Sequence, residues 1–305
     1  MAFTAKDVQA LRERTGCGMM DCKKALTASD GDMDKAVEFL REKGLAAAEK
    51  KAGRIAAEGV VYAAVEGKTG VVIEVNSETD FVGKNEDFQS FVKGVASVVL
   101  NSNPADVDAL VQMKFDDKNT VGEALREKIA IIGENLQIRR FVRYEGYCVP
   151  YIHSGGRIGV LVQFESNKDI SSNAAFEEMG KDVAMQIAAL SPQFLDKDAV
   201  PAETLQKEKE ILMAQIKNDP KMSGKPENII EKMVEGRVGK FYDTFCLTEQ
   251  EYVKDSSMKV KDYVQSKAKE LGAELSIKAF TRFERGEGIE KKEDDFAAEV
   301  AKLVK

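Results

Sequence analysis

The stretch TVGEALREKIAIIGENLQIRRFVRYEG (residues 120–146) returns near the other end of the chain as KVKDYVQSKAKELGAELSIKAFTRFERGEG (residues 259–288). At one constant offset Gly133 falls on Gly272, with apolar residues at helical spacing before it and an alternating stretch after it. Each copy therefore predicts a helix that ends at a C-cap glycine and is followed by a β-strand. The other matched pairs are Val121 and Val260, Leu125 and Val264, Leu136 and Leu275, Ile138 and Ile277, Phe141 and Phe280, Arg143 and Arg282, and Glu145 and Glu284.

The residues before each copy also match. EGVVYAAVEGKTGVVIEV (58–75) parallels EGYCVPYIHSGGRIGVLVQF (145–164), and both read as strand, glycine-containing turn and apolar strand. That order predicts a β-hairpin, and an amphipathic helix follows each hairpin. The sequence therefore predicts an α+β protein whose core is two β-β-α-α-β units, each a small antiparallel sheet backed by helices. The apolar stripes of the two helices are Phe88, Phe91, Val92, Val95, Val98 and Val99, and Phe176, Met179, Val183, Ile187 and Leu190.

Helical segments lie outside this core. Residues 1–44 predict three short helices, of which the first opens with a capping-box pattern at Thr4 and the third ends at Gly44. Residues 45–57 are rich in Ala, Lys and Glu and predict a helical or flexible linker. The second copy carries an insertion at 191–242 that predicts an αα-hairpin projecting from the sheet. The pattern fits an interaction surface and a hairpin packed on its own core equally well.

The composition is that of a soluble globular chain, with 305 residues of which 43% are hydrophobic and 32% are charged. No apolar run approaches the roughly 18 residues that span a bilayer, and no secretory signal is expected. A net charge of −7 argues against direct nucleic-acid binding. Four scattered cysteines suggest reduced thiols, so we expect a cytoplasmic protein that does not bind a membrane.

Residue patterns of known catalytic sites are missing from the sequence. His153 is its one histidine, and neither C-x2-C nor H-E-x-x-H spacing predicts a zinc site. Cys17 and Cys22 lack the redox C-x-x-C spacing, and a thiol enzyme built on one of them is a minor alternative. There is no phosphate-binding loop and no G-x-S-x-G elbow. The sequence therefore favours protein–protein binding over catalysis and predicts no cofactor or metal.

One turn differs between the two copies. After its hairpin the first copy has NSETDFVGKNEDF (76–88), where the second has ESNKDISSNAAF (165–176). The shared architecture thus tolerates a turn without the Asp80–Phe81 pair. Phe81 either points toward something outside the chain or tucks under its own turn, and the residues alone weigh these two interpretations equally.

Six long motifs follow one another along the chain: LRERTGCGMMDCKKAL (11–26), VIEVNSETDFVGKNEDF (72–88), KIAIIGENLQIRR (128–140), GGRIGVLV (155–162), KMVEGRVGKFYDTFCLTEQEYVKD (232–255) and RFERGEGIEKKEDDFAAEVA (282–301). With them the chain closely resembles bacterial translation elongation factor Ts over nearly its whole length. The resemblance implies the following parts: a ubiquitin-associated-like three-helix module (1–44), a linker (45–57), a core N-subdomain (58–144), a core C-subdomain (145–190 and 243–286), an inserted coiled-coil or dimerisation hairpin (191–242) and a C-terminal helical tail (287–305).

The resemblance also implies a function. Members of this family are guanine-nucleotide exchange factors that bind the GDP form of the GTPase elongation factor Tu, speed GDP release and leave when GTP enters. Such a factor acts by differential binding, so it is not expected to be an enzyme that makes or breaks bonds. Two copies could pair through the hairpin into a homodimer or a 2:2 complex, and the sequence does not decide this.

Site residues follow from the family's motifs. The loop that helps to dislodge the partner's Mg²⁺ falls on Thr79, Asp80, Phe81 and Val82, and Phe81 would be the wedge. The other implied contacts are Arg12, Met19 and Met20 with the GTPase domain, His153 with the phosphate side of that domain, and Val253 with the partner's distal domain. Alternatively, Met19 or Met20 fills the module's own core, and His153 is a hydrogen-bonded turn residue.

A function of another class stays open beside this one. A ubiquitin-associated-like adapter or chaperone would bind partners without nucleotide exchange. It would need only residues 1–44, whereas an exchange factor needs the turn that carries Phe81.

Overall fold

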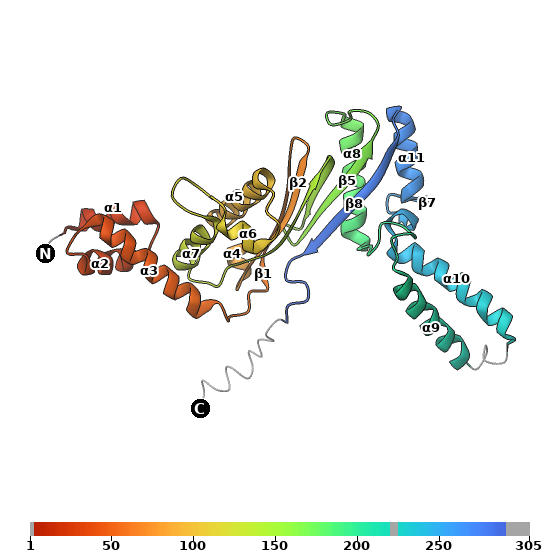
Figure 1. Ribbon diagram of the computed structural model, residues 1–305, viewed down its shortest axis with the longest axis horizontal. Coiled ribbons are helices and arrows are strands. Elements are labelled where there is room, and N and C mark those ends of the chain that lie inside the picture. Colours follow the sequence, from red (N-terminus) through yellow and green to blue (C-terminus); the bar gives the residue numbers. More distant parts are fainter. Residues whose placement is uncertain (1–2, 220–224, 291–305) are drawn as a thin grey trace.

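The computed structural model describes residues 3–219 and 225–290 of the chain. The chain forms N-terminal helices, two three-stranded sheets with covering helices, a helical hairpin and a further two-stranded sheet. Figure 1 shows the N-terminal helices at one end, the larger sheets in the middle and the hairpin at the other end. The helices are α1 (Ala5–Thr15), α2 (Met19–Ala28), α3 (Met33–Lys51), α4 (Asp80–Gly83), α5 (Glu86–Ser102), α6 (Val107–Gln112), α7 (Val121–Ile132), α8 (Ala174–Leu190), α9 (Ala202–Asn218), α10 (Glu227–Phe245), the 3-10 turn η1 (Leu247–Glu249) and α11 (Val260–Leu271). The strands are β1 (Glu58–Glu66), β2 (Thr69–Ser77), β3 (Gln137–Glu145), β4 (Tyr147–His153), β5 (Ile158–Ser166), β6 (Glu251–Tyr252), β7 (Asp255–Lys259) and β8 (Leu275–Glu284).

The repeat predicted from the sequence is confirmed. One antiparallel sheet has the strand order β1-β2-β3 and the other β4-β5-β8, so each copy supplies a hairpin and a returning third strand. Helices α5 and α7 lie between the second and third strands of the first copy, as α8 and α11 do in the second. Both central strands also carry a register shift at the matching place, between Glu74 and Val75 and between Gln163 and Phe164. The α+β class is therefore correct.

The two sheets pack face to face, and their outer faces are covered by helices. Along β2, Val71 and Ile73 join a core with α5 and α7, whereas Val72 faces a second core shared with Leu161 of β5. This alternation follows from the two-residue period of a strand. On the far side, Val160 and its neighbours pack against α8 and α11. The molecule is thus four layers thick in its middle, in the order helix, sheet, sheet, helix.

Two matching glycines let the sheets approach each other closely. A Cβ on Gly70 of β2 would lie 2.8 Å from Cys148 Cβ in the opposite sheet. A Cβ on Gly159, the equivalent residue of β5, would overlap Val61 of β1. In each copy, a glycine near the start of the central strand therefore allows the sheet of the other copy to pack closely against it.

The N-terminal helices differ from the prediction at one boundary. The third helix, α3, does not end at Gly44 but continues to Lys51, so the first part of the expected linker is helical. Gly44 serves close packing rather than capping, since a Cβ there would lie 3.3 Å from Ala130 of α7. The Ala-, Lys- and Glu-rich residues after it favour helix. The remaining segment is anchored, because Ala56 and Ala57 are buried.

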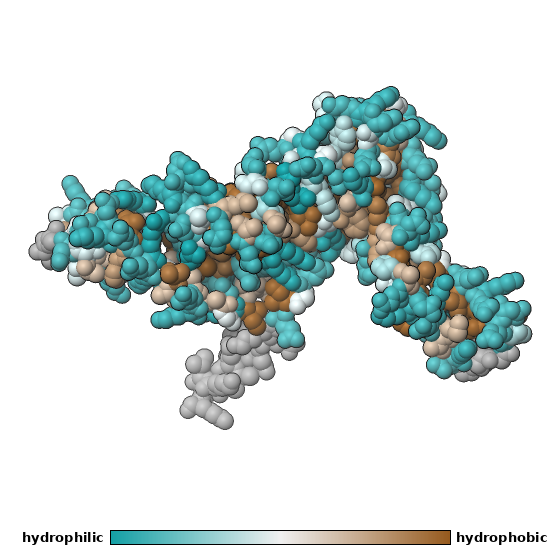
Figure 2. Space-filling model, viewed as in Figure 1, coloured by the Kyte–Doolittle hydropathy of each residue, from teal (hydrophilic) through white to brown (hydrophobic). Residues whose placement is uncertain are grey.

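The inserted hairpin consists of α9 and α10, which project from the sheets in Figure 1. Leu212, Ile216, Ile230 and Val234 form a core between the two helices, while hydrophilic residues cover most of the outside on the face shown in Figure 2. Helix α10 runs past the expected end of the insertion, to Phe245. The expected C-terminal helix at 287–305 lies mostly outside the described residues, which end at residue 290.

Candidate functional site

The Asp80–Phe81 pair lies in a one-turn helix, α4, that follows β2 after the short link of Glu78 and the N-cap residue Thr79. Phe81 is 79% exposed, the largest exposed fraction of any large apolar side chain that the structure describes. A side chain so exposed gains little from its own fold. The interpretation that Phe81 tucks under its own turn is therefore wrong.

The sister turn in the second copy shows the opposite arrangement. There the aligned pair is Asp169–Ile170, and Ile170 is only 5% exposed, within the core that α8 and α11 share with β5. The same turn of the same fold can thus bury its apolar residue. The outward position of Phe81 is a property of the first copy alone.

The remainder of the turn is fixed to the core. Val82 is buried against the core of the first copy. Gly83 lies so close to β1 that a Cβ there would be 2.8 Å from the carbonyl oxygen of Gly59. Asn85 then caps α5 by accepting a hydrogen bond from the backbone N–H of Phe88 at 3.0 Å. Phe81 is therefore presented on a short helix with a buried residue directly behind it.

Asp80 and Lys84 form an ion pair one helical turn apart, with 2.7 Å between Nζ and Oδ2. The pKa of the Asp80 carboxyl lies below its ordinary value, first because Lys84 donates this hydrogen bond. The ammonium group of Lys84 also lies 6.0 Å from the centre of the Phe81 ring. The exposed aromatic thus stands beside a carboxylate that is ionised at neutral pH.

The turn that follows His153 packs on the same strand as α4. His153 itself is exposed, and its Nδ1 lies 3.2 Å from the hydroxyl of Tyr151. Gly156, three residues on, accepts a hydrogen bond from Val61 of β1 at 2.7 Å. Arg285 lies between the two turns, since its backbone N–H donates to Arg157 and its guanidinium donates to the Gly59 carbonyl behind α4. The structure therefore brings the His153 turn and the Phe81 turn to the first residues of β1.

The N-terminal candidates are also on the surface. Met19 and Met20 begin α2 and are 56% and 64% exposed, so neither fills the module's own core. Arg12 on α1 is exposed as well. That core is formed by other side chains, namely Val8, Leu11, Cys22, Ala25, Leu26, Ala36 and Leu40.

Val253 lies in the tight turn between β6 and β7 and is 48% exposed. Its backbone N–H donates to the buried Gln186 side chain at 2.8 Å. The residues on either side, Tyr252 and Lys254, both reach the buried carboxylate of Asp182. Burial alone would raise the pKa of Asp182, but hydrogen bonds from Lys254, Tyr252 and Tyr263 outweigh it and hold that pKa below its ordinary value. The turn is thus well anchored, with Val253 outside.

These candidates do not converge on one pocket. Helix α2, helix α4 and strand β7 lie well apart along the long axis of the molecule in Figure 1.

Within residues 3–219 and 225–290, no group of three or more His, Cys, Asp or Glu could hold a metal ion. No helix in the same ranges is long and apolar enough to cross a membrane. Burial raises the pKa of the Cys17 thiol, which disfavours a reactive thiolate there.

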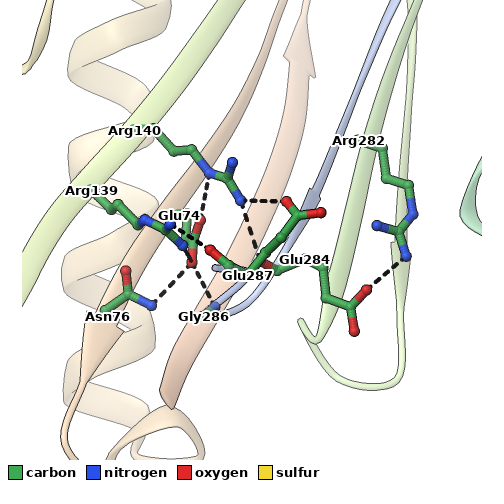
Figure 3. A network of polar contacts seen from close by, with 8 residues as sticks. All are labelled: Glu74, Asn76, Arg139, Arg140, Arg282, Glu284, Gly286 and Glu287. Atoms are coloured by element: carbon green, nitrogen blue, oxygen red, sulfur yellow. Dashed lines mark hydrogen bonds and ion pairs between the residues drawn. The ribbon is translucent and has the colours of Figure 1, made fainter. Parts of the chain in front are cut away.

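Sequence reasoning missed a buried polar network between the two copies, drawn in Figure 3. Glu74 of β2 is fully buried and accepts hydrogen bonds from Arg139 at 3.0 Å, Arg140 at 2.6 Å and the backbone N–H of Gly286 at 2.8 Å. Arg140 also pairs with Glu287, at 3.1 Å. The network ties the end of the second copy to the first sheet. A carboxylate inside an otherwise apolar strand was the available signal.

Glu134 was also missed. Its carboxylate accepts hydrogen bonds from the backbone N–H groups of Glu78 and Thr79, at 3.1 and 3.0 Å, and from the Thr79 hydroxyl, at 2.7 Å. It therefore holds the residue that caps α4. Nothing in the sequence pattern joins the two positions, because they meet only once the third strand has returned to the sheet.

The fold and this surface define a class of protein: an α+β chain of two repeated units that presents exposed side chains on anchored turns. The family model described as Elongation factor TS matches residues 78–287. The chain belongs to this family, and it is therefore a translation elongation factor.

Curated relatives agree over nearly the whole chain. Elongation factor Ts of Trichlorobacter lovleyi is 54% identical, with 99% of this chain and 98% of the relative covered. The proteins of the same name from Clostridium botulinum strain Alaska E43 and Clostridium perfringens strain SM101 are each 52% identical. These alignments cover 98% of both chains for the first and 99% of both for the second.

Proposed function

We infer that the chain is a guanine-nucleotide exchange factor that binds the GDP form of elongation factor Tu and promotes GDP release and GTP loading. The observation that supports this best is Phe81, an aromatic that is 79% exposed on a turn whose other residues are anchored. An exposed aromatic on a rigid support suits insertion into a pocket of a partner protein.

The proposed mechanism needs no bond chemistry in this chain. Phe81 enters the partner beside its Mg²⁺ site, with Thr79 and Val82 as the flanks of the wedge. Asp80 brings a negative charge that disturbs the water and Mg²⁺ network. These contacts form best when Mg²⁺ and GDP have left, so binding of the factor weakens binding of GDP. By reciprocity, GDP or GTP with Mg²⁺ must weaken binding of the factor by the same ratio.

The other exposed residues supply the grip that the wedge needs. Arg12, Met19 and Met20 bind the GTPase domain, where the flexible methionine side chains adapt to an apolar surface. His153 approaches the phosphate side of the same domain, and Val253 touches the distal domain. Their separation along the molecule suits a large partner that is contacted at several points. Two copies pairing through α9 and α10 would make the complex 2:2.

The linkage between the two ligands gives a direct test. Isothermal titration should show tight binding to nucleotide-free elongation factor Tu, and GDP with Mg²⁺ should weaken it by about a hundredfold or more. Equal affinity for both forms would exclude exchange by this mechanism.

The adapter alternative predicts a different pattern in the full chain. An adapter that works through α1 to α3 would bind its partner equally well with or without Phe81. If Phe81→Ala leaves both binding and GDP release unchanged while Met20→Ala abolishes binding, the adapter function is the better one.

A further inference from the structure

We propose that Glu134 is a positioning residue for nucleotide exchange, which holds the Asp80–Phe81 turn in the geometry that the partner binds. This inference rests on the proposed function and adds a residue to it. Glu134 lies at the end of α7, directly after the C-cap Gly133. It would not touch the partner's nucleotide, and its effect would pass through Thr79 and α4.

The contacts of Glu134 are those of a clamp. One carboxylate oxygen accepts the backbone N–H groups of both Glu78 and Thr79, and the other accepts the Thr79 hydroxyl. Hydrogen bonds to a charged acceptor are the stronger kind. They fix Glu78 and Thr79, the two residues that join the end of β2 to α4, and so they set the direction in which the next residues point.

A comparison of the two copies distinguishes the hydrogen bonds of Glu134 from hydrogen bonds that both copies of the fold share. In the first copy, the Glu78 side chain accepts the Asn135 backbone N–H at 2.6 Å. In the second copy, Asn167 accepts the backbone N–H of Glu274 in the same way, at 2.9 Å. This tie between the turn and the helix–strand corner occurs in both copies and is architectural.

The clamp occurs in the first copy only. At the position of Glu134 the second copy has Ala273, which has no carboxylate. The second copy is also the one whose turn buries Ile170 instead of exposing an aromatic. The second copy joins the same two segments differently, because the ammonium group of Lys168, the equivalent of Thr79, donates to the carbonyl of Gly272. The carboxylate clamp thus accompanies the outward side chain and is missing where the apolar residue packs inward.

The physical benefit of the clamp is preorganisation. Phe81 has little packing of its own to hold it, and a mobile turn would lose conformational freedom on binding. A turn that is already ordered avoids that cost. Glu134 should therefore affect how well Phe81 works, without being needed for the fold of the core.

A double-mutant cycle tests this, with exchange measured by stopped-flow release of fluorescent GDP from elongation factor Tu. Glu134→Ala should lower the second-order rate constant roughly fivefold to thirtyfold. In the Phe81→Ala background the same change should cost less than about twofold, because the residue through which it acts is gone. Urea unfolding should show the same small destabilisation in both backgrounds.

The matched control is Asp169→Ala in the sister turn. Asp169 aligns with Asp80 and accepts the backbone N–H and the hydroxyl of Ser171, at 3.1 and 2.7 Å, so its removal takes hydrogen bonds of the same kind from the sister turn. It should leave exchange unchanged. Equal losses from Glu134→Ala with and without Phe81, or an equal loss from Asp169→Ala, would overturn the positioning role.

Hydrogen exchange of the free chain tests the clamp without the partner. Glu134→Ala should speed exchange of the Thr79 amide at least tenfold, because its acceptor is removed, while amides of β5 stay protected. Unchanged protection of Thr79 would overturn the inference by itself. If the unaltered chain fails to accelerate GDP release, the proposed function is what fails, and with it the role of the clamp toward the partner.

Discussion

The clearest prediction for a single residue concerns the exposed ring of Phe81. Phe81→Ala should slow exchange at least tenfold, since a central aromatic anchor often contributes 2 kcal/mol or more to binding. It should change the free energy of unfolding by less than about 0.5 kcal/mol, because the ring is largely in water. Stopped-flow GDP release and urea unfolding measure the two effects on the same samples.

Phe88 provides the comparison, since it lies seven positions later in the chain and is fully buried. Phe88→Ala should cost roughly 3–5 kcal/mol of stability. If Phe81→Ala destabilises the chain by a similar amount, the ring belongs to its own core and not to a partner's.

Whether the sequence predicts the role of such a residue depends on how far along the chain its neighbours in space lie. The comparison of the two turns already gave the outward position of Phe81 as one of two interpretations, because both turns can be compared along the sequence. Glu134 could not be predicted in the same way. It lies 55 positions from Thr79 along the chain, and the two meet only through the pairing of β2 with β3.

The pKa of Glu249 leads to a prediction about the stability of the segment that joins α10 to β6. It lies in η1, between α10 and β6, and it is nearly fully buried. Burial alone would raise its pKa, but hydrogen bonds from Lys261 and Lys259 outweigh burial and lower the pKa from 4.5 to about 2. The ionised form therefore stabilises the fold above about pH 4.5, and this stabilisation is lost as the pH falls toward 2.

Glu249→Gln tests this assignment. At pH 6 the variant should be less stable than the unaltered chain, by on the order of 2 kcal/mol. The difference should shrink as the pH falls from about 4.5 toward 2, because the carboxyl of the unfolded chain is then protonated and the ionised form no longer favours the folded chain as strongly. Urea unfolding at several pH values gives the difference, and a gap that stays constant across this range would rule the assignment out.

Elements were predictable where their pattern was long. The helices and strands of the repeat have enough apolar positions to show their period, and they were found. Helix α6 and the short strands β6 and β7 were not predicted, since none has more than six residues. The expected end of α3 at Gly44 was wrong because that glycine lies inside the helix, where a Cβ would be 3.3 Å from Ala130 of α7, a contact that sequence alone does not show.

The close contact between the two sheets leads to a prediction about the stability of the whole molecule. Gly159→Ala should destabilise the chain by about 1–3 kcal/mol, because the added Cβ would overlap Val61 of the opposite sheet. The matched control is Gly236→Ala in α10, where a Cβ would meet nothing within 4 Å. That change should stabilise the helix by about 0.5–1 kcal/mol. Urea midpoints that move in the same direction for both variants would contradict the close packing of the two copies.

At the level of the whole molecule, the candidate binding residues are exposed side chains and not the lining of one pocket. The exposed Met19 and Met20 lie on α2, Phe81 lies on α4 and Val253 lies in the turn between β6 and β7. These elements are distributed along the molecule in Figure 1. The most direct measurement is release of fluorescent GDP from elongation factor Tu in stopped flow, with the chain present in catalytic amounts. We predict that the rate of release rises in proportion to the concentration of the chain, and that one chain serves many GTPase molecules. Release at the spontaneous rate, at any concentration of the chain, would contradict its proposed role as an exchange factor.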